Sequence, residues 1–328
     1  MYDPAVQTTL VAAIREALHD AMAADDRVIV LGEDVGALGG VFRATDQLLA
    51  AFGPDRIRDM PLNEGGIVGA AIGMALVGQR PVVEIQFADF VYPAFDQIVN
   101  ELAKLRWRSA GQWSAPVVVR MPVGGGVGGG PYHSQSPEAF FAHVPGLRVM
   151  CPSTPADAYG LLRAAVECPD PVIFLEPKRL YRSARGPLPP TDARPELVGV
   201  MQRRAGKDVT VACWGGLVPM CLSAAERAAV DGVDVEILDL ARLIPMDRIG
   251  LSNHVRRTGR LVVAHEAPLT GGLAAEVIAS LDRDAFFSLQ APPERVCGAD
   301  VPVPYRHEEH ALPSEDDVHA AIARVMTA

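Results

Sequence analysis

The feature that most constrains this chain is a repeated alternation between short unbroken apolar runs and segments with helical apolar spacing. Residues 28–31 (Val-Ile-Val-Leu) are apolar without a break, whereas residues 9–24 place Leu10, Ile14 and Leu18 on one helical face. An unbroken apolar run predicts a strand that is buried on both faces, as in a parallel sheet. The alternation therefore predicts an α/β fold in which helices cover a mostly parallel sheet.

The alternation occurs in two blocks, separated by a segment with four prolines at residues 183–200. In the first block we expect further strands at 81–87, 116–121, 147–150 and 171–175, and helices at 67–77, 95–107 and 156–166. In the second block we expect strands at 209–213, 233–238 and 261–264, and helices at 217–229, 248–256, 273–281 and 315–326. The predicted organisation is two doubly wound α/β domains, at residues 1–182 and 201–328, joined by an extended linker.

Composition excludes several classes of function. The chain has 40 acidic and 30 basic residues, a formal charge of −10, which disfavours a nucleic-acid partner. Its five cysteines show no C-x-x-C pair and are expected to be reduced, buried thiols. No signal peptide is visible at the N-terminus and no apolar run is long enough for a membrane span, so we expect a cytoplasmic protein.

A run of six glycines around Val127, at residues 124–130, contains a formal G-x-G-x-x-G. A dinucleotide site needs this motif to open a helix directly, with an acidic residue about 20 positions later. The run is followed instead by Pro-Tyr-His-Ser-Gln-Ser-Pro, so we expect a tightly turning loop rather than a site for NAD.

Three other loops carry polar or aromatic residues where α/β proteins bind ligands. Glu64 stands at the start of a predicted helix, where a carboxylate also simply stabilises the helix dipole. Phe90 follows a predicted strand and either stacks on a flat ligand or belongs to the core. His133 lies among glycines, prolines and hydroxyl groups, which is unusual for a core residue, and its ring is suited to proton transfer.

Taken together, several runs resemble one known family. They are P-L-N-E-G-G-I-V-G at 61–69, E-I-Q-F-A-D-F at 84–90, H-S-Q-S-P-E-A-F-F-A-H at 133–143 and H-E-A-P-L-T-G-G at 265–272. The family is the β subunits of the thiamin-diphosphate-dependent decarboxylating component of 2-oxo acid dehydrogenase complexes. The resemblance covers essentially the whole chain, and the branched-chain members are the most similar.

The resemblance implies a pyrimidine-binding domain in the first half and a transketolase-like C-terminal domain in the second. It also implies an α2β2 heterotetramer, with each thiamin diphosphate shared between an α and a β chain. In the family the α chain holds the diphosphate and Mg²⁺ through a G-D-G…N segment, and this sequence contains no G-D-G. We therefore expect the chain to supply only part of the cofactor site.

Individual residues match positions with known roles in the family. Glu64 matches the carboxyl group that contacts N1′ of the aminopyrimidine, and its apolar neighbours, Leu62 among them, are expected to bury it. Phe90 matches the aromatic residue that stacks on the ring, and Leu62 and Gln86 match positions in the wall around it. His133 matches the histidine associated with acyl transfer to a lipoyl group of the acyltransferase core.

The family also implies two sites away from the cofactor. Some members hold a structural potassium ion through backbone carbonyls, and the matching positions here are Val117, Ala165, Val166, Cys168 and Asp170. Cys168 stands where the family commonly has a carboxylate. In the C-terminal tail, Glu308 and Glu309 are candidates for docking the basic subunit-binding domain of the acyltransferase core.

The expected function is that of a 3-methyl-2-oxobutanoate dehydrogenase β subunit, an oxidoreductase with a lipoyl acceptor that is active only together with α. The same architecture also fits a pyruvate or acetoin dehydrogenase. A non-catalytic scaffold subunit is a further alternative, and it would require Glu64 to be dispensable. A free-standing transketolase is disfavoured, because 328 residues without G-D-G leave no room for a diphosphate-binding domain.

Overall fold

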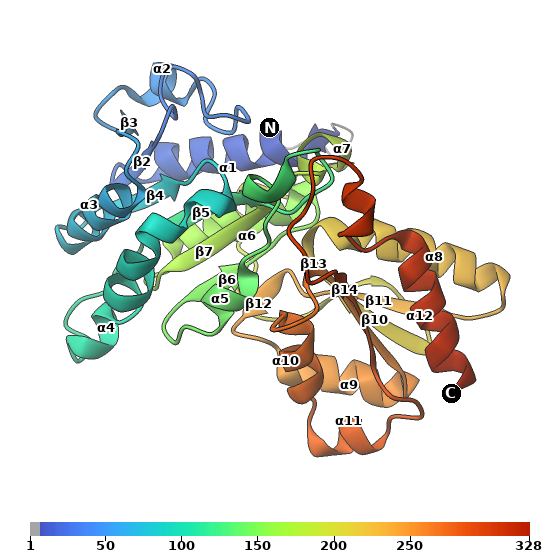
Figure 1. Ribbon diagram of the computed structural model, residues 1–328. Helices are drawn as coiled ribbons and strands as arrows, with labels where there is room; N and C mark the ends of the chain where they lie inside the picture. The colour runs from blue at the N-terminus through green and yellow to red at the C-terminus, as the bar shows by residue number, and fades with distance from the viewer. Residues whose placement is uncertain (1–6) are drawn as a thin grey trace. The chain divides into compact units, whose positions relative to one another are not determined.

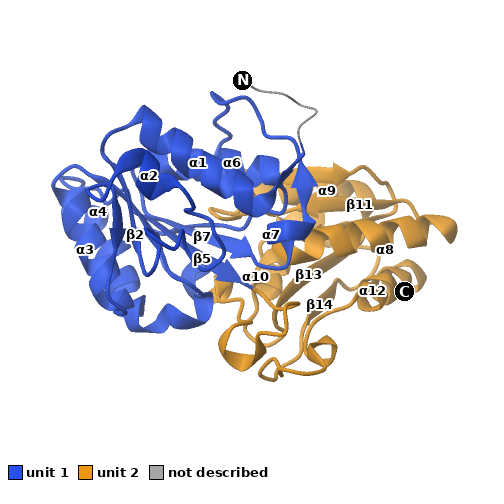
Figure 2. Cartoon of the chain, turned by 90° about the horizontal axis from the view of Figure 1, so that it is seen from above, with its two compact units in different colours: residues 1–123, 140–197 blue, residues 124–139, 198–328 orange. Residues whose placement is uncertain are grey.

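The computed structural model describes residues 7–328, and these form two compact units (Figure 1, Figure 2). Unit 1 contains residues up to 123 together with 140–197, and unit 2 contains residues 124–139 and 198–328. The glycine run and His133 therefore group with the C-terminal half of the chain. Residues 1–6, on which the expectation of no signal peptide partly depends, lie outside the described residues.

Unit 1 is built on a parallel sheet. Its strands lie in the order β6-β7-β5-β4-β2-β3, and every neighbouring pair is parallel, as predicted. Their bounds are β2 (Val28–Gly32), β3 (Ile57–Asp59), β4 (Arg80–Glu84), β5 (Val118–Val123), β6 (Arg148–Met150) and β7 (Val172–Pro177). The predicted central strands are buried along their whole length, because helices cover both faces of the sheet.

Two long helices of unit 1 pack against each other, α1 (Leu10–Ala24) and α6 (Pro155–Glu167). Each begins at a threonine whose side chain accepts a backbone hydrogen bond, Thr9 from Ala12 at 3.3 Å and Thr154 from Asp157 at 3.2 Å. The remaining helices are α2 (Leu48–Phe52), α3 (Glu64–Leu76), α4 (Leu105–Arg108), α5 (Glu138–Ala142) and α7 (Leu180–Ser183). Short strands β1 (Thr8–Thr9) and β8 (Arg185–Gly186) pair antiparallel.

The prediction of one continuous helix at residues 95–107 is wrong. The structure has a π-helical segment, η3 (Gln97–Leu102), followed by the separate short helix α4. The N–H of Ala103 donates to the carbonyl of Ile98, five residues earlier, at 3.0 Å. This wider turn shifts the apolar spacing by one residue, which a periodicity of 3.6 does not reveal.

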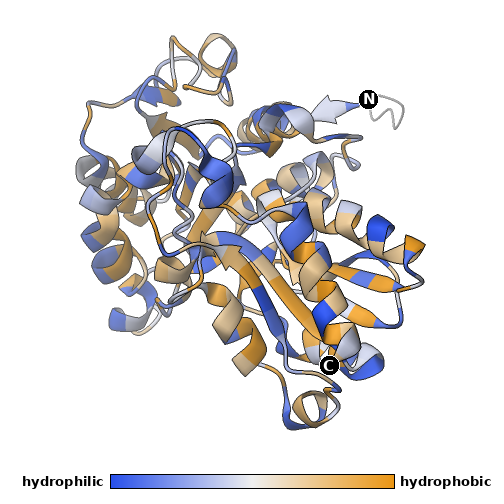
Figure 3. Cartoon of the chain, turned by 45° about the vertical axis from the view of Figure 1, so that its right-hand side comes forward, coloured by the Kyte–Doolittle hydropathy of each residue, from blue (hydrophilic) through white to orange (hydrophobic). Residues whose placement is uncertain are grey.

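Unit 2 has its own sheet, with strands in the order β14-β13-β10-β11-β9. Their bounds are β9 (Met201–Arg204), β10 (Val209–Cys213), β11 (Val235–Asp239), β13 (Leu261–Pro268) and β14 (Glu294–Gly298), and β12 (Arg242–Ile244) follows β11 in the chain. Only β9 runs antiparallel to its neighbour within this sheet. Figure 3 shows hydrophobic colours along much of this sheet, whereas β9 (Met-Gln-Arg-Arg) is mostly hydrophilic.

The helices of unit 2 lie on both faces of this sheet (Figure 2). They are α8 (Val218–Val230), α9 (Arg248–Thr258), α10 (Leu273–Ala279), α11 (Arg283–Phe287) and α12 (Glu315–Thr327). The apolar faces of α8 and α12 join the sheet in one core that includes Val211, Ile237 and Ile322. The second predicted domain is thus a doubly wound α/β unit.

The remaining general expectations concern cysteines and membranes. Cys151, Cys168, Cys213 and Cys221 are buried, Cys297 is partly exposed, and all five are free thiols. Across residues 7–328, every helix is too short or too polar to cross a membrane.

Candidate active site

Three neighbouring strands of unit 1 end together and bring the predicted cofactor residues to one edge. Gly32, the last residue of β2, is in register with Asp59 of β3 and with Glu84 of β4. Because these strands are parallel, the loops that follow them emerge at the same edge. Those loops carry Glu33, the segment leading to Glu64, and the segment from Gln86 to Phe90.

Glu64 is the first residue of α3 and is half-buried. Its position is set by Asn63, whose side chain accepts a hydrogen bond from the N–H of Gly66 at 2.9 Å and so caps the helix. Leu62 is 81% exposed, so the expectation that it buries Glu64 is wrong for this chain. At Gly65 a Cβ atom would lie 3.0 Å from the carbonyl oxygen of Pro93, so the backbone at Pro93 packs closely against the start of α3.

A second acid, Glu33, lies close enough to interact with Glu64. Burial raises the pKa of Glu33, and the negative charges of Glu64 and Asp34 raise it further. Within residues 7–328, its buried Oε1 has no hydrogen-bond partner. No role was predicted for Glu33 from the sequence. The available signal was its position directly after a buried strand.

Gln86 and Phe90 complete this edge. The Nε2 atom of Gln86 lies 3.5 Å from Oδ2 of Asp34, which links the loops after β4 and β2. Phe90 ends the short helix η1 (Ala88–Phe90), is half-buried, and packs edge-on to Phe87 with 5.5 Å between ring centroids. The edge therefore combines carboxyl groups with a partly exposed aromatic ring. These residues fit an aminopyrimidine, which has hydrogen-bonding ring substituents and flat faces.

A buried ion network lies within the same sheet. Arg120 of β5 donates to Glu84 of β4 at 2.7 Å and to Glu176 of β7 at 2.8 Å and 3.0 Å, and Tyr181 donates to Glu176 at 2.5 Å. Burial works to lower the pKa of Arg120, but the charges of Glu176 and Glu84 outweigh it and raise the pKa. The network thus keeps one cation between two carboxylates inside the sheet that positions the site.

His133 belongs to unit 2 and follows the glycine run. It directly follows the short helix η4 (Gly130–Tyr132) and is half-buried. The N–H of Gly124 donates to the carbonyl of Gln135 at 2.9 Å and closes the loop at its base. The prediction that the glycine run forms a loop rather than opening a long helix is confirmed.

A buried cluster in unit 2 was not predicted. The indole N–H of Trp214 donates to Glu138 at 3.2 Å, and Trp214 stacks on His265 with 5.0 Å between centroids. Nδ1 of His265 lies 4.0 Å from Glu138, and Nε2 lies 3.3 Å from Sγ of Cys297. Burial raises the pKa of Glu138 to about 7, and burial lowers the pKa of His265 to about 4.

The predicted potassium positions lie together, but their contacts do not fit a cation well. The carbonyl of Val166 accepts a hydrogen bond from the guanidinium of Arg80 at 2.8 Å. Asp170 pairs with Arg106 at 2.7 Å and lies 3.6 Å from Arg148. Two further carbonyls accept backbone hydrogen bonds, that of Val117 from Val172 and that of Ala165 from Cys168. Because guanidinium groups already contact the Val166 carbonyl and Asp170, no part of the function is assigned to potassium.

The two acidic residues predicted for docking differ in their surroundings. Glu309 is exposed and its carboxylate lies 3.0 Å from Nδ1 of His307. Glu308 is half-buried, and its two oxygens accept hydrogen bonds from Gly126 at 3.2 Å and Gly128 at 3.1 Å. Glu309 is thus the more accessible of the two.

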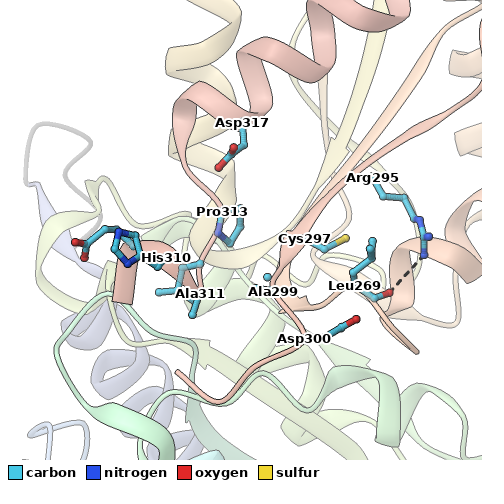
Figure 4. A pocket seen from close by; sticks show the side chains of 12 residues that line it. Leu269, Arg295, Cys297, Ala299, Asp300, His310, Ala311, Pro313 and Asp317 are labelled. Carbon is cyan, nitrogen blue, oxygen red and sulfur yellow. Dashed lines mark hydrogen bonds between the residues drawn. The ribbon is translucent and has the colours of Figure 1, made fainter. Parts of the chain in front are cut away.

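Unit 2 also contains a cavity of about 410 Å³ (Figure 4). Arg295, Cys297 and Asp300 line it together with His310 and Asp317. In Figure 4 Arg295 stands on the opposite side from His310. None of its lining residues is among those predicted to contact the aminopyrimidine.

Comparison with known proteins identifies the family. Residues 7–184 match the pyrimidine-binding domain of transketolase, and residues 199–318 match the transketolase C-terminal domain. The chain is 48% identical to the 3-methyl-2-oxobutanoate dehydrogenase subunit beta of Mycobacterium tuberculosis, over 97% of this chain and 92% of that protein. The chain belongs to the β subunits of branched-chain 2-oxo acid dehydrogenases.

Other known proteins are similar to this chain along most of their length. The 2-oxoisovalerate dehydrogenase subunit beta 2 of Arabidopsis thaliana is 46% identical over 95% of this chain and 87% of that protein. The pyruvate dehydrogenase E1 component subunit beta of Leifsonia xyli is 46% identical over 98% and 96%. A solved split-gene transketolase, an inactive β4 tetramer, matches with a TM-score of 0.78 and 25% identity over 97% of this chain and 98% of that chain.

Proposed function

We propose that this chain is the β half of a branched-chain 2-oxo acid dehydrogenase that decarboxylates its substrate and transfers the acyl group to lipoyl groups. The observation that carries the proposal is the pair of interacting acids, Glu33 and Glu64, at the edge where β3, β2 and β4 end. Its relatives named as branched-chain enzymes support the choice of substrate. The alternative is pyruvate, which is supported by the relative from Leifsonia xyli.

The residues at the sheet edge hold the pyrimidine of thiamin diphosphate in this proposal. Glu64 would hydrogen-bond to N1′ of the ring, Phe90 would stack on one face, and Leu62 and Gln86 would line the surroundings. When bound, thiamin diphosphate supplies the carbon nucleophile and the electron sink that decarboxylation requires. The exposed side chain of Leu62 suits a site that is covered only when a second subunit is added.

His133 acts at a different stage. Because His133 is half-buried and lies outside the apolar core, its imidazole can hold or donate a proton to the carbonyl of a bound substrate. We assign it to acyl transfer, where it would donate a proton or orient the substrate while the lipoyl sulfur accepts the acyl group. This assignment separates two stages: Glu64 serves activation of the cofactor, and His133 serves transfer of the acyl group.

The active species in this proposal is a cytoplasmic α2β2 heterotetramer bound to an acyltransferase core. The α subunit holds Mg²⁺ and the diphosphate, because this sequence lacks the G-D-G segment for that task. Docking to the core uses acidic side chains of the tail, Glu309 above all. Charge reversal at Glu309 is the cleaner test of docking, because Glu308 also contacts the glycine loop.

The experiment replaces Glu64 with glutamine in the reconstituted α2β2 enzyme. The variant keeps the size of the side chain but not its acid–base chemistry, so we expect the rate with 3-methyl-2-oxobutanoate to fall by about 10²- to 10⁴-fold. Glu226→Gln, which makes the same chemical change at an exposed carboxylate of α8 (Val218–Val230), is the matched control. Near-normal turnover by the glutamine variant would support the scaffold alternative, and a faster rate with pyruvate or acetoin would change the substrate assignment.

A further inference from the structure

The loop in front of His133 is held by two carboxylates from the C-terminal part of the same unit. Glu308 accepts a hydrogen bond from the N–H of Gly126 at 3.2 Å with one oxygen, and from Gly128 at 3.1 Å with the other. Glu266 accepts a hydrogen bond from the N–H of Gly125 at 3.2 Å. Hydrogen bonds to a charged acceptor are stronger than those between neutral groups. Three backbone N–H groups of one short loop are thus held by two acids.

The tail segment that carries Glu308 also fits closely against this loop. A Cβ atom added to Gly125 would collide with the side chain of Leu312, and one added to Gly130 would collide with the ring of Tyr305. On the other side, a Cβ atom on Gly129 would lie 2.9 Å from both Cβ and the carbonyl oxygen of His133. The glycines therefore allow the loop to contact the tail and His133 without steric conflict.

This loop needs external support to keep one conformation. Six of its seven residues, 124–130, are glycine, and four of these have positive φ angles between 67° and 84°. Glycine loses more conformational entropy on ordering than any other residue, so the loop has little intrinsic preference for its observed shape. The carboxylates of Glu308 and Glu266 supply contacts that favour this shape.

We propose that Glu308, supported by Glu266, is a positioning residue that fixes the glycine loop and, through Gly129, the placement of His133. The inference rests on the role in acyl transfer proposed above for His133. It gives Glu308 a task within the chain, in addition to the docking role predicted from the sequence.

The direct test is hydrogen exchange of the peptide that spans residues 124–130, in the assembled α2β2 enzyme. Glu308→Ala should speed exchange of the Gly126 and Gly128 amides by about 10- to 100-fold, as expected when a hydrogen bond to a charged group is lost. Glu308→Gln keeps one acceptor oxygen and should have a smaller effect. Glu226→Gln, at an exposed carboxylate of α8, is the matched control.

The kinetic test measures two rates on the same preparations. Transfer to a lipoylated domain requires the step assigned to His133, whereas reduction of an artificial electron acceptor reports decarboxylation without that transfer. Misplacing a catalytic group by about 1 Å can lower a reaction rate 10²-fold. Glu308→Ala should therefore lower the rate of acyl transfer by about 10- to 100-fold and change the rate of acceptor reduction much less. In a His133→Ala background, Glu308→Ala should cause no further loss.

The outcomes separate this inference from the proposed function. Unchanged exchange in the loop, an equal loss of both rates, or a further loss in the His133→Ala background would each overturn the positioning role. Normal acyl transfer by Glu308→Ala, with defective transfer by His133→Ala, would reject this inference alone. Normal transfer by His133→Ala would instead reject the role of His133, and the positioning role would be rejected with it.

Discussion

Replacing Glu138 with glutamine should change how the stability of the protein depends on pH. Glu138 is buried with its pKa raised to about 7 from 4.5, and the adjacent His265 is buried with its pKa lowered to about 4 from 6.5. Protonation of Glu138 stabilises the folded protein at low pH, and this contribution is lost as pH rises from 4.5 through 7. The neutral form of His265 stabilises it at high pH, and this contribution is lost as pH falls from 6.5 through 4.

Between pH 4.5 and 6.5 the two contributions have opposite slopes and nearly cancel. Each group contributes about 1.4 kcal/mol per pH unit across these two units, so each changes the free energy of unfolding by about 3 kcal/mol. Relative to the unaltered protein, Glu138→Gln should therefore become more stable by about 3 kcal/mol as pH rises through this window. His265→Gln should show the opposite trend with a similar size.

Urea unfolding at pH 4.5, 5.5 and 6.5 measures this effect. Trp214 is a local probe, because it contacts both groups and is buried, whereas Trp107 and Trp113 are 90% and 55% exposed. Glutamine at position 138 keeps an acceptor for the indole N–H, so the fold should be retained. If both variants follow the pH profile of the unaltered protein in parallel, the opposing titrations of Glu138 and His265 are refuted.

Two further predictions concern unit 1. Arg120→Met leaves Glu84 and Glu176 buried without their cation, so it should lower the free energy of unfolding by about 3–5 kcal/mol at neutral pH. The control variant Arg106→Met breaks a partly exposed pair with Asp170 and should lower it by less than about 1 kcal/mol. Equal losses in the two variants would contradict the argument. Because the guanidinium of Arg80 contacts the carbonyl of Val166, potassium should raise the midpoint temperature of thermal unfolding no more than sodium does at equal concentration. A clearly higher midpoint temperature in potassium than in sodium would restore the predicted ion site.

The fold was predictable where strands are buried on both faces. Continuous apolar runs identified β2, β5, β7 and β10, whose residues are all buried. Edge strands were missed: β3 has only Ile57 buried, and β14 contains charged residues and alternating exposure. An edge strand has a neighbour on one side only and can be partly exposed to solvent, so its sequence can lack the apolar run that signals a central strand.

The identity of the candidate site residues could be predicted from the sequence, but their contacts and exposure could be predicted less well. Glu64, Gln86 and Phe90 follow strands or open a helix, and the parallel register brings them to one edge, as the motifs implied. The exposure of Leu62 and the contact of Arg80 with Val166 depend on segments far apart in sequence. So do the hydrogen bonds of Glu308 and Glu266 to the glycine loop. Local patterns carry no information about such distant contacts.

The grouping of residues 124–139 with unit 2 affects any attempt to divide this protein. A fragment that stops in the proline-rich segment would include His133 but would lack Glu266, Tyr305, Glu308 and Leu312, all of which contact the loop before it. Such a fragment would present the histidine on an unsupported stretch of glycines, so a lack of activity in it would say nothing about the imidazole itself. The two halves of the sequence can be cut apart, but the loop in the first half is held by residues of the second.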